Sequence, residues 1–157
     1  MSANIPGIVL ALYALIMWSY PITGGHINPA VTFGIYVKGY KHYLKNLPMF
    51  ITILAGAFSG AFAGANIFLW IVKGPSGFKA HLYPREGVDN GQAFFIEMVC
   101  TGFFVFAICL IKFPNTSRFV SEEPMLKVGF GIVMLTMALN ACGPYTGGCL
   151  NPAVGVA

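Results

Sequence analysis

Charged residues are scarce in this chain. Only 9% of its 157 residues are Asp, Glu, Lys or Arg, and just five are acidic. A soluble domain carries roughly 25% charged residues, which keep its surface hydrated. This scarcity argues against a soluble domain, as do a hydrophobic fraction of 57% and a mean hydropathy of +0.73. The composition predicts an integral protein of a lipid bilayer, where aromatic residues and glycine are also enriched.

Several chemical signatures are missing as well. The four cysteines form no C-x-x-C pair, so we interpret them as small hydrophobic residues and expect no metal site. The nine Lys and Arg residues are spread between apolar runs and not clustered with aromatics, which argues against a nucleic-acid partner. The sequence contains no Ser-His-Asp set, phosphate-binding glycine loop or pair of carboxylates, so we do not expect an enzyme.

Four apolar runs have roughly the length of a bilayer crossing, about 20 residues at 1.5 Å each. We predict membrane-spanning helices over residues 5–20, 47–72, 92–113 and 125–142. Asn90 and Gly91 are predicted to start the third helix. The Glu-Glu-Pro sequence at residues 122–124 is predicted to start the fourth, with proline in the first turn.

The basic residues indicate which side each connection faces. Six of the nine lie in or beside the connections at residues 38–46 and 114–124, and three lie at residues 73–91. Lys and Arg are enriched in cytoplasmic connections. We therefore expect the first two connections on the cytoplasmic side, in a membrane that the sequence does not identify.

One face of the second predicted span is made of small residues. Gly56, Gly60 and Gly64 recur every four residues, which places them on the same side of a helix. Bare backbone at such a face lets another helix approach closely. We predict a helix-packing surface here and not a binding site.

An internal repeat is the most informative feature. Residues 21–31 recur as residues 144–154, with eight of eleven positions identical at an offset of 123. Each copy begins with a glycine-rich turn and continues into an Asn-Pro-Ala box, in which Asn is a helix N-cap and Pro the first helical residue. The two boxes are Asn28, Pro29, Ala30 and Asn151, Pro152, Ala153.

The first copy predicts a half-length helix. Residues 29–39 would extend only about 16 Å, half of a hydrocarbon core of roughly 30 Å. This segment ends at a lysine suited to the membrane surface, so it must begin near the membrane centre. Three full spans separate the two copies, an odd number, so the second copy enters from the opposite face. Irregular backbone at that depth is tolerated where protein buries it or where it lines a water-filled cavity, and broken helices in inverted repeats mark transport sites.

The two asparagines suit a pore centre. Each side-chain oxygen can cap its own half-helix, which leaves the amide NH2 group to donate hydrogen bonds into the lumen. Each helix N-terminus also carries roughly half a positive charge, which opposes cations and protons. We therefore predict that Asn28 and Asn151 orient the oxygen of a passing water molecule. The alternative is that they are two ordinary N-caps.

Paired Asn-Pro-Ala boxes, each preceded by Gly-Gly, on inverted repeats resemble the major intrinsic proteins, the family of aquaporins and aquaglyceroporins. The segment at residues 95–102 resembles the fourth span of that family, in which a glutamate braces the backbone of a re-entrant loop. The resemblance assigns this role to Glu97, whereas an intramembrane carboxylate alone suggests a proton relay. It also implies that His26 is a structural hydrogen-bonding group of the first loop.

The resemblance is to four of the family's six spans, the second to the fifth. We therefore expect one all-α, aquaporin-like domain over residues 1–157, without the first and last spans, which belong to a longer protein or are replaced by other chains. The family usually places Arg directly after the second box, where this chain has Val154. Alignment outward from the two asparagines gives the other constriction positions as Ile8, Leu139 and Gly148. The quartet has no charge and no side-chain donor, which implies a wider, more apolar constriction than that of a water-selective pore.

Two hypotheses follow. The first is a passive, cofactor-free channel for water or small neutral solutes, multi-pass in the bilayer and, by resemblance, a homo-tetramer with one pore per subunit. The second is a non-conducting, aquaporin-like structural subunit of a larger membrane assembly. Intact Asn28 and Asn151 favour the first hypothesis, whereas the missing spans and Val154 favour the second.

Overall fold

The computed structural model describes residues 5–39, 43–72, 83–112 and 123–157, and this part of the chain contains helices and no strand. The helices are α1 (Ile5–Thr23), α2 (Pro29–Lys38), α3 (Tyr43–Val72), α4 (Asn90–Lys112), α5 (Pro124–Thr146) and α6 (Pro152–Val156). Four of them, α1, α3, α4 and α5, are long and apolar enough to cross a membrane. The prediction of an all-α, multi-pass membrane protein is therefore confirmed. The predicted sidedness depends on connections that lie partly outside the described residues.

The two spans that precede the repeated motifs are longer than predicted. Helix α1 continues to Thr23 and α5 to Thr146, each passing through a proline, at Pro21 and Pro144. Both prolines lie in the last turn of their helix, where proline removes one backbone hydrogen bond but retains a helical φ. Each helix ends two residues after its proline, where a glycine with positive φ follows, Gly24 or Gly147. Helix α3 is also longer than predicted and begins at Tyr43.

Helix α4 begins with a capping box that the sequence analysis does not predict. The side-chain oxygen of Asp89 accepts hydrogen bonds from the backbone N–H groups of Gly91 (2.7 Å) and Gln92 (2.9 Å). The Gln92 side chain in turn accepts from the backbone N–H of Asp89, at 3.2 Å. This reciprocal pair is a capping box. The cap is therefore Asp89, and the helix starts at Asn90, one of the two residues that the sequence analysis predicts to start it.

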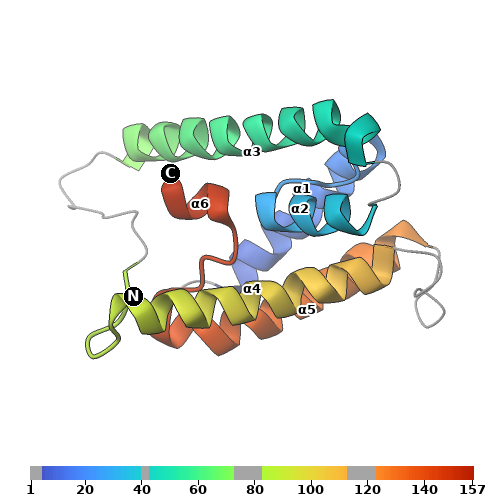
Figure 1. Ribbon diagram of the computed structural model, residues 1–157. Coiled ribbons are helices and arrows are strands. Elements are labelled where there is room, and N and C mark those ends of the chain that lie inside the picture. The colour runs from blue at the N-terminus through green and yellow to red at the C-terminus, as the bar shows by residue number, and fades with distance from the viewer. Residues whose placement is uncertain (1–4, 40–42, 73–82, 113–122) are drawn as a thin grey trace.

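The half-helices lie inside the molecule. In Figure 1, α2 and α6 lie between α3 on one side and the α4–α5 pair on the other. Helix α2 contacts α3, α4 and α6, and α6 contacts α3. Each half-helix starts near the middle of the molecule and runs toward an opposite end (Figure 1). This arrangement confirms the predicted inverted repeat.

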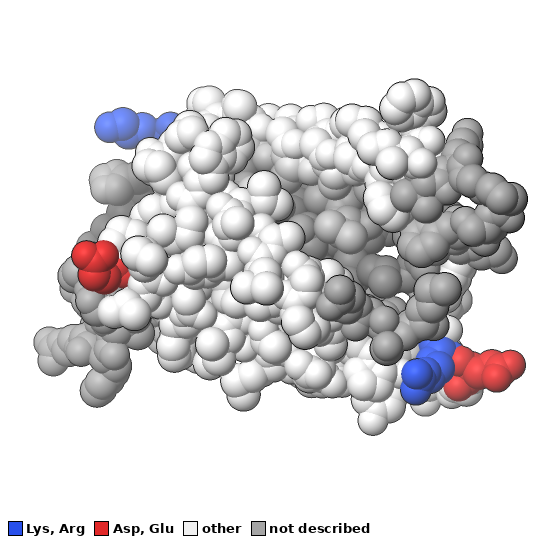
Figure 2. All heavy atoms as spheres, turned by 180° about the vertical axis from the view of Figure 1, so that it is seen from behind, with Lys and Arg blue, Asp and Glu red and all other residues white. Residues whose placement is uncertain are grey.

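The core lies where α4 and α5 pack together and against the loops that precede the half-helices. Its most buried large side chains are Leu150 and Cys142, and Phe104, Leu135 and Leu139 surround them. By contrast, α1 has no buried residue, and neither does the apolar stretch of α3. Figure 2 shows charged atoms at two opposite ends of the described surface and an uncharged face between them. Such a surface fits the hydrocarbon layer of a bilayer.

Candidate functional site

Two glycine-rich loops precede the half-helices, and their backbones are equivalent. Gly24 and Gly25 have φ values of +76° and +71°, and the equivalent Gly147 and Gly148 have +89° and +71°. Glycine adopts this left-handed region at little cost because it has no Cβ. The Gly-Gly pair of each repeat is therefore required by the turn that brings the chain back into the molecule.

Each asparagine caps its own half-helix. The side-chain oxygen of Asn28 accepts a hydrogen bond from the backbone N–H of Ala30 at 2.9 Å, and that of Asn151 accepts from Ala153 at 3.0 Å. Proline occupies the first helical position in both cases. Because the oxygen is fixed by the helix, the NH2 group of each side chain points away from it.

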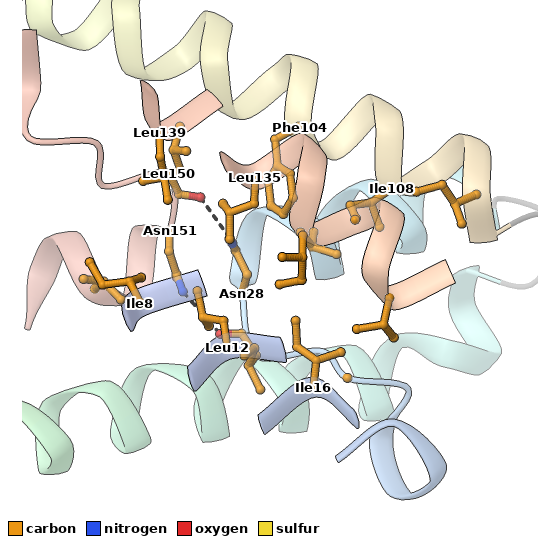
Figure 3. Close-up of a pocket in the computed structure, with 18 of the residues that line it drawn as sticks. Ile8, Leu12, Ile16, Asn28, Phe104, Ile108, Leu135, Leu139, Leu150 and Asn151 are labelled. Atoms are coloured by element: carbon orange, nitrogen blue, oxygen red, sulfur yellow. Dashed lines mark hydrogen bonds between the residues drawn. The ribbon is translucent and has the colours of Figure 1, made fainter. Parts of the chain in front are cut away.

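The two asparagines also connect the repeats to each other. The Asn28 amide donates to the backbone carbonyl of Leu150 at 2.9 Å, and the Asn151 amide donates to the carbonyl of Ile27 at 3.4 Å (Figure 3). Each acceptor is the residue directly before the opposite asparagine. The sequence analysis expected these NH2 groups to donate into the lumen and did not expect the bonds between the loops. Each gives one hydrogen to the facing loop, because the caps meet closely enough to bond, and keeps one.

Glu97 of α4 lies against the second loop. Its two carboxylate oxygens accept from the backbone N–H groups of Cys149 and Leu150, both at 2.9 Å, and one also accepts from the hydroxyl of Thr146. These donors belong to a turn in which Leu150 has a φ of +50°, a strained value for leucine. The carboxylate thus satisfies backbone donors that the strained turn leaves without helical partners.

The first loop is contacted by a residue that the sequence analysis treated only as a flanking charge. The ammonium group of Lys112, at the end of α4, donates to the carbonyl of Gly24 at 3.0 Å and lies 2.6 Å from Nε2 of His26. The remaining ring nitrogen of His26, Nδ1, is buried without a described partner. Helix α4 therefore contacts both loops, through an acid near one end and a base at the other. Between the Gly-Gly pair and the asparagine, the first loop has His-Ile where the second has Cys-Leu, and this difference is the only signal in the sequence for the contact.

A pocket of about 390 Å³ passes between α1, α4, α5 and the two loops. The pair of asparagines lies on its wall, with Ile8 and Leu139 toward one end and Ile16 and Ile108 toward the other (Figure 3). All four predicted constriction residues line it: Ile8, Leu139, Gly148 and Val154. The glycines of both loops also line it, and they contribute backbone polar atoms to a mainly apolar wall.

The predicted packing glycines have open space beside them in the described part of the chain. A Cβ added at Gly56, Gly60 or Gly64 would meet no described atom within 4 Å. Among the helix glycines, the closest contact lies instead at Gly34 of α2, where an added Cβ would collide with Cγ1 of Val105. The spacing of the α3 glycines identifies a small-residue face, but the partner for that face is not among the described residues.

Metal ligation has no support in the described part of the chain. No group of three or more His, Cys, Asp or Glu side chains lies close enough there to hold an ion. His26 is held by Lys112, and the Cys149 thiol donates to the carbonyl of Asn151 at 3.0 Å. The two residues that occupy equivalent positions in the repeats therefore have different partners.

These features define an inverted-repeat membrane fold, in which two half-helices meet end to end beside one pocket. The chain belongs to the family described as Major intrinsic protein, whose sequence profile it matches over residues 3–157.

The chain is similar to aquaporins and an aquaglyceroporin from different organisms. The chain is 31% identical to Aquaglyceroporin-3 of Trypanosoma brucei brucei over 93% of its length, and 32% identical to an Aquaporin PIP-type of Atriplex canescens over 90%. It is 29% identical to Aquaporin-5 of Mus musculus over 92%. These alignments cover 49%, 50% and 52% of the respective relatives, so the chain spans about half their length.

Proposed function

We propose that the pocket between the half-helices is part of a passive channel for water or small neutral solutes. One observation carries this proposal: on the wall of a mainly apolar pocket, the asparagine of each half-helix donates a hydrogen bond to the loop before the other half-helix. Members of the major intrinsic protein family are channels and not enzymes, in agreement with the absence of a catalytic constellation from the sequence. The names of the relatives include both aquaporins and an aquaglyceroporin.

The geometry supports selection at the asparagines. Each side-chain amide keeps one N–H after bonding the facing loop, so two donors are present at the same depth. The N-terminus of α2, a helix of 10 residues, adds a partial positive charge. A water oxygen or a solute hydroxyl oxygen is attracted to this point, whereas a cation is repelled.

The constriction supports passage of solutes larger than water. Ile8, Leu139 and Val154 supply only hydrocarbon, and Gly148 supplies only backbone. An apolar wall offers little hydrogen bonding to a water file and accommodates the carbon backbone of a polyol. We therefore propose that glycerol-sized solutes pass as well as water.

The first test is osmotic swelling of proteoliposomes that contain the full natural protein. The double substitution Asn28→Ala and Asn151→Ala removes two N-caps, each worth about 1 kcal/mol. It also removes the hydrogen bond from each asparagine to the facing loop. We expect swelling to fall toward the rate of empty liposomes. The matched control replaces Asn66 and Asn140 by Ala, since these asparagines are exposed and bond only to their own helices. Swelling of the control is expected to equal that of the natural protein.

The uncharged Val154 at the constriction favours the non-conducting alternative. Swelling no faster than that of empty liposomes, in both water and glycerol gradients and with helical content intact, would favour this structural role.

By family resemblance we further propose a homo-tetramer with one pore per subunit. Light scattering of the detergent-solubilised protein tests this assembly, and a monomer would contradict it.

A further inference from the structure

Lys112 is a charged residue on the pocket wall that the proposed channel mechanism does not use. It is the last residue of α4 and is half-buried. Its ammonium group donates to the Gly24 carbonyl, contacts Nε2 of His26, and lies 6.0 Å from the ring centre of Tyr20. All three partners belong to the end of α1 or to the first re-entrant loop.

The position of this lysine is unusual for a helix end in a membrane protein. A terminal lysine ordinarily extends its charge outward to the interface and to water. Here two acceptors hold the charge at the pocket. An ammonium group has three donors. Gly24 and His26 occupy two of them, and the third is available to water or to a solute oxygen.

The charges on the pocket wall are all of one sign. Lys112 and Lys127 are the charged residues that line the pocket, and no acidic side chain lines it among the described residues. Lys127 lies in the first turn of α5, which packs antiparallel to α4, so both lysines are at the same end (Figure 1). At the opposite end, where Ile8 and Val154 lie, none of the described residues that line the pocket is charged.

We propose that Lys112 is a specificity-determining residue that selects neutral solutes with oxygen acceptors and rejects cations at this mouth of the pocket. The proposal rests on the channel function proposed above and adds a second point of selection, distinct from the asparagines. A cation that passes about 6 Å from the Lys112 ammonium group, at an effective dielectric constant of about 20, is repelled strongly enough to lower its permeation rate about a hundredfold. Urea and guanidinium distinguish this effect, because they are planar and similar in shape and differ in charge.

The experiment measures urea and guanidinium permeability in proteoliposomes with the full natural protein and with Lys112→Gln. Glutamine keeps an NH2 donor for the Gly24 carbonyl but has no charge. If Lys112 acts through its charge, the ratio of guanidinium to urea permeability rises by between about tenfold and a hundredfold in Lys112→Gln. It stays at the natural value in Lys112→Arg. A purely structural lysine predicts an unchanged ratio in Lys112→Gln.

Lys38→Gln is the matched control. Lys38 is a lysine at the end of α2 that reaches the Cys109 carbonyl of α4 at 3.4 Å but does not line the pocket, so its removal should leave the ratio unchanged. An equal rise in this control would overturn the proposal, as would an unchanged ratio in Lys112→Gln with urea flux preserved. If the natural protein passes no urea, this proposal is overturned, and osmotic swelling of the same proteoliposomes shows separately whether the channel proposal stands.

A measurement on the natural protein covers the case in which the Lys112 variants do not fold. Raising the ionic strength from about 0.01 M to about 1 M shortens the screening length from about 30 Å to about 3 Å. The ratio of guanidinium to urea permeability should then rise. A ratio independent of ionic strength would contradict a charge at a water-filled mouth.

Discussion

At the scale of single residues, asparagine is the side chain that the centre of this molecule requires. Aspartate also caps a helix but cannot donate, and serine has a single donor on a shorter side chain. The capping roles of Asn28 and Asn151 are predictable from the Asn-Pro sequence alone. Their bonds to the opposite loops are not, because they join residues more than 120 positions apart and depend on how deeply the two loops approach each other.

Lys112 shows the limit of sequence analysis at this scale. Charge counting uses it only to orient the chain, because a lysine at the end of an apolar run usually marks a membrane surface. Whether such a side chain points outward or inward depends on which helix end lies beside it. Here the end of α1 and the first loop supply the acceptors, and no local periodicity encodes that contact.

Glu97 provides a prediction about stability. Glu97→Gln replaces one acceptor oxygen by an NH2 group that faces a backbone donor in the second loop. We expect the free energy of unfolding to fall by about 1–3 kcal/mol, since a buried backbone N–H loses a charge-assisted partner. Thermal unfolding in detergent measures the change. Glu86→Gln is the control, because Glu86 is an exposed residue outside the helices. Equal stability of both variants would show that Glu97 does not brace the loop.

At the scale of helices, small residues identify a face but not its neighbour. The regular spacing of Gly56, Gly60 and Gly64 predicts a packing surface, yet the closest helix contact of a described glycine lies at Gly34, an isolated glycine of α2. A four-residue period reports only that three residues share a side. The contact at Gly34 arises because the re-entrant α2 is inserted between α3 and α4, which follows from the topology of the repeat.

Alanine substitutions test whether Gly34 of α2 and Gly60 of α3 differ in how closely they are packed. Gly34→Ala is expected to destabilise the protein by about 1–3 kcal/mol, because its methyl group collides with Val105, whose branched side chain has little freedom in a helix. Gly60→Ala should be neutral or stabilise by up to about 1 kcal/mol, since alanine favours a helix more than glycine does. Chemical unfolding of each variant followed by circular dichroism gives the comparison. Similar values for the two variants would contradict the close approach of α2 to α4.

At the scale of the whole molecule, the topology is the most predictable property. A repeated motif, a half-length helix and an odd number of intervening spans are sufficient to predict two half-helices that approach from opposite faces. The surroundings are less predictable. Helices α1 and α3 expose large apolar side chains, and hydropathy does not distinguish a lipid-facing helix from one that packs against another helix. The pocket dimensions also depend on packing between distant segments.

The central claim is that solutes pass through the pocket and are selected at its uncharged constriction. Val154→Arg tests it most directly, because it adds a large charged side chain to that constriction and should change selectivity as well as rate. The measurement is the ratio of glycerol to water permeability in proteoliposomes with the full natural protein. Val156→Arg is the control, since Val156 is 71% exposed and does not line the pocket.

We predict that Val154→Arg lowers this ratio by about tenfold or more, as expected when a selecting pocket loses space for the larger solute. Val156→Arg should leave the ratio unchanged. A ratio that is the same in both variants and in the natural protein would contradict the claim and place the solute path elsewhere.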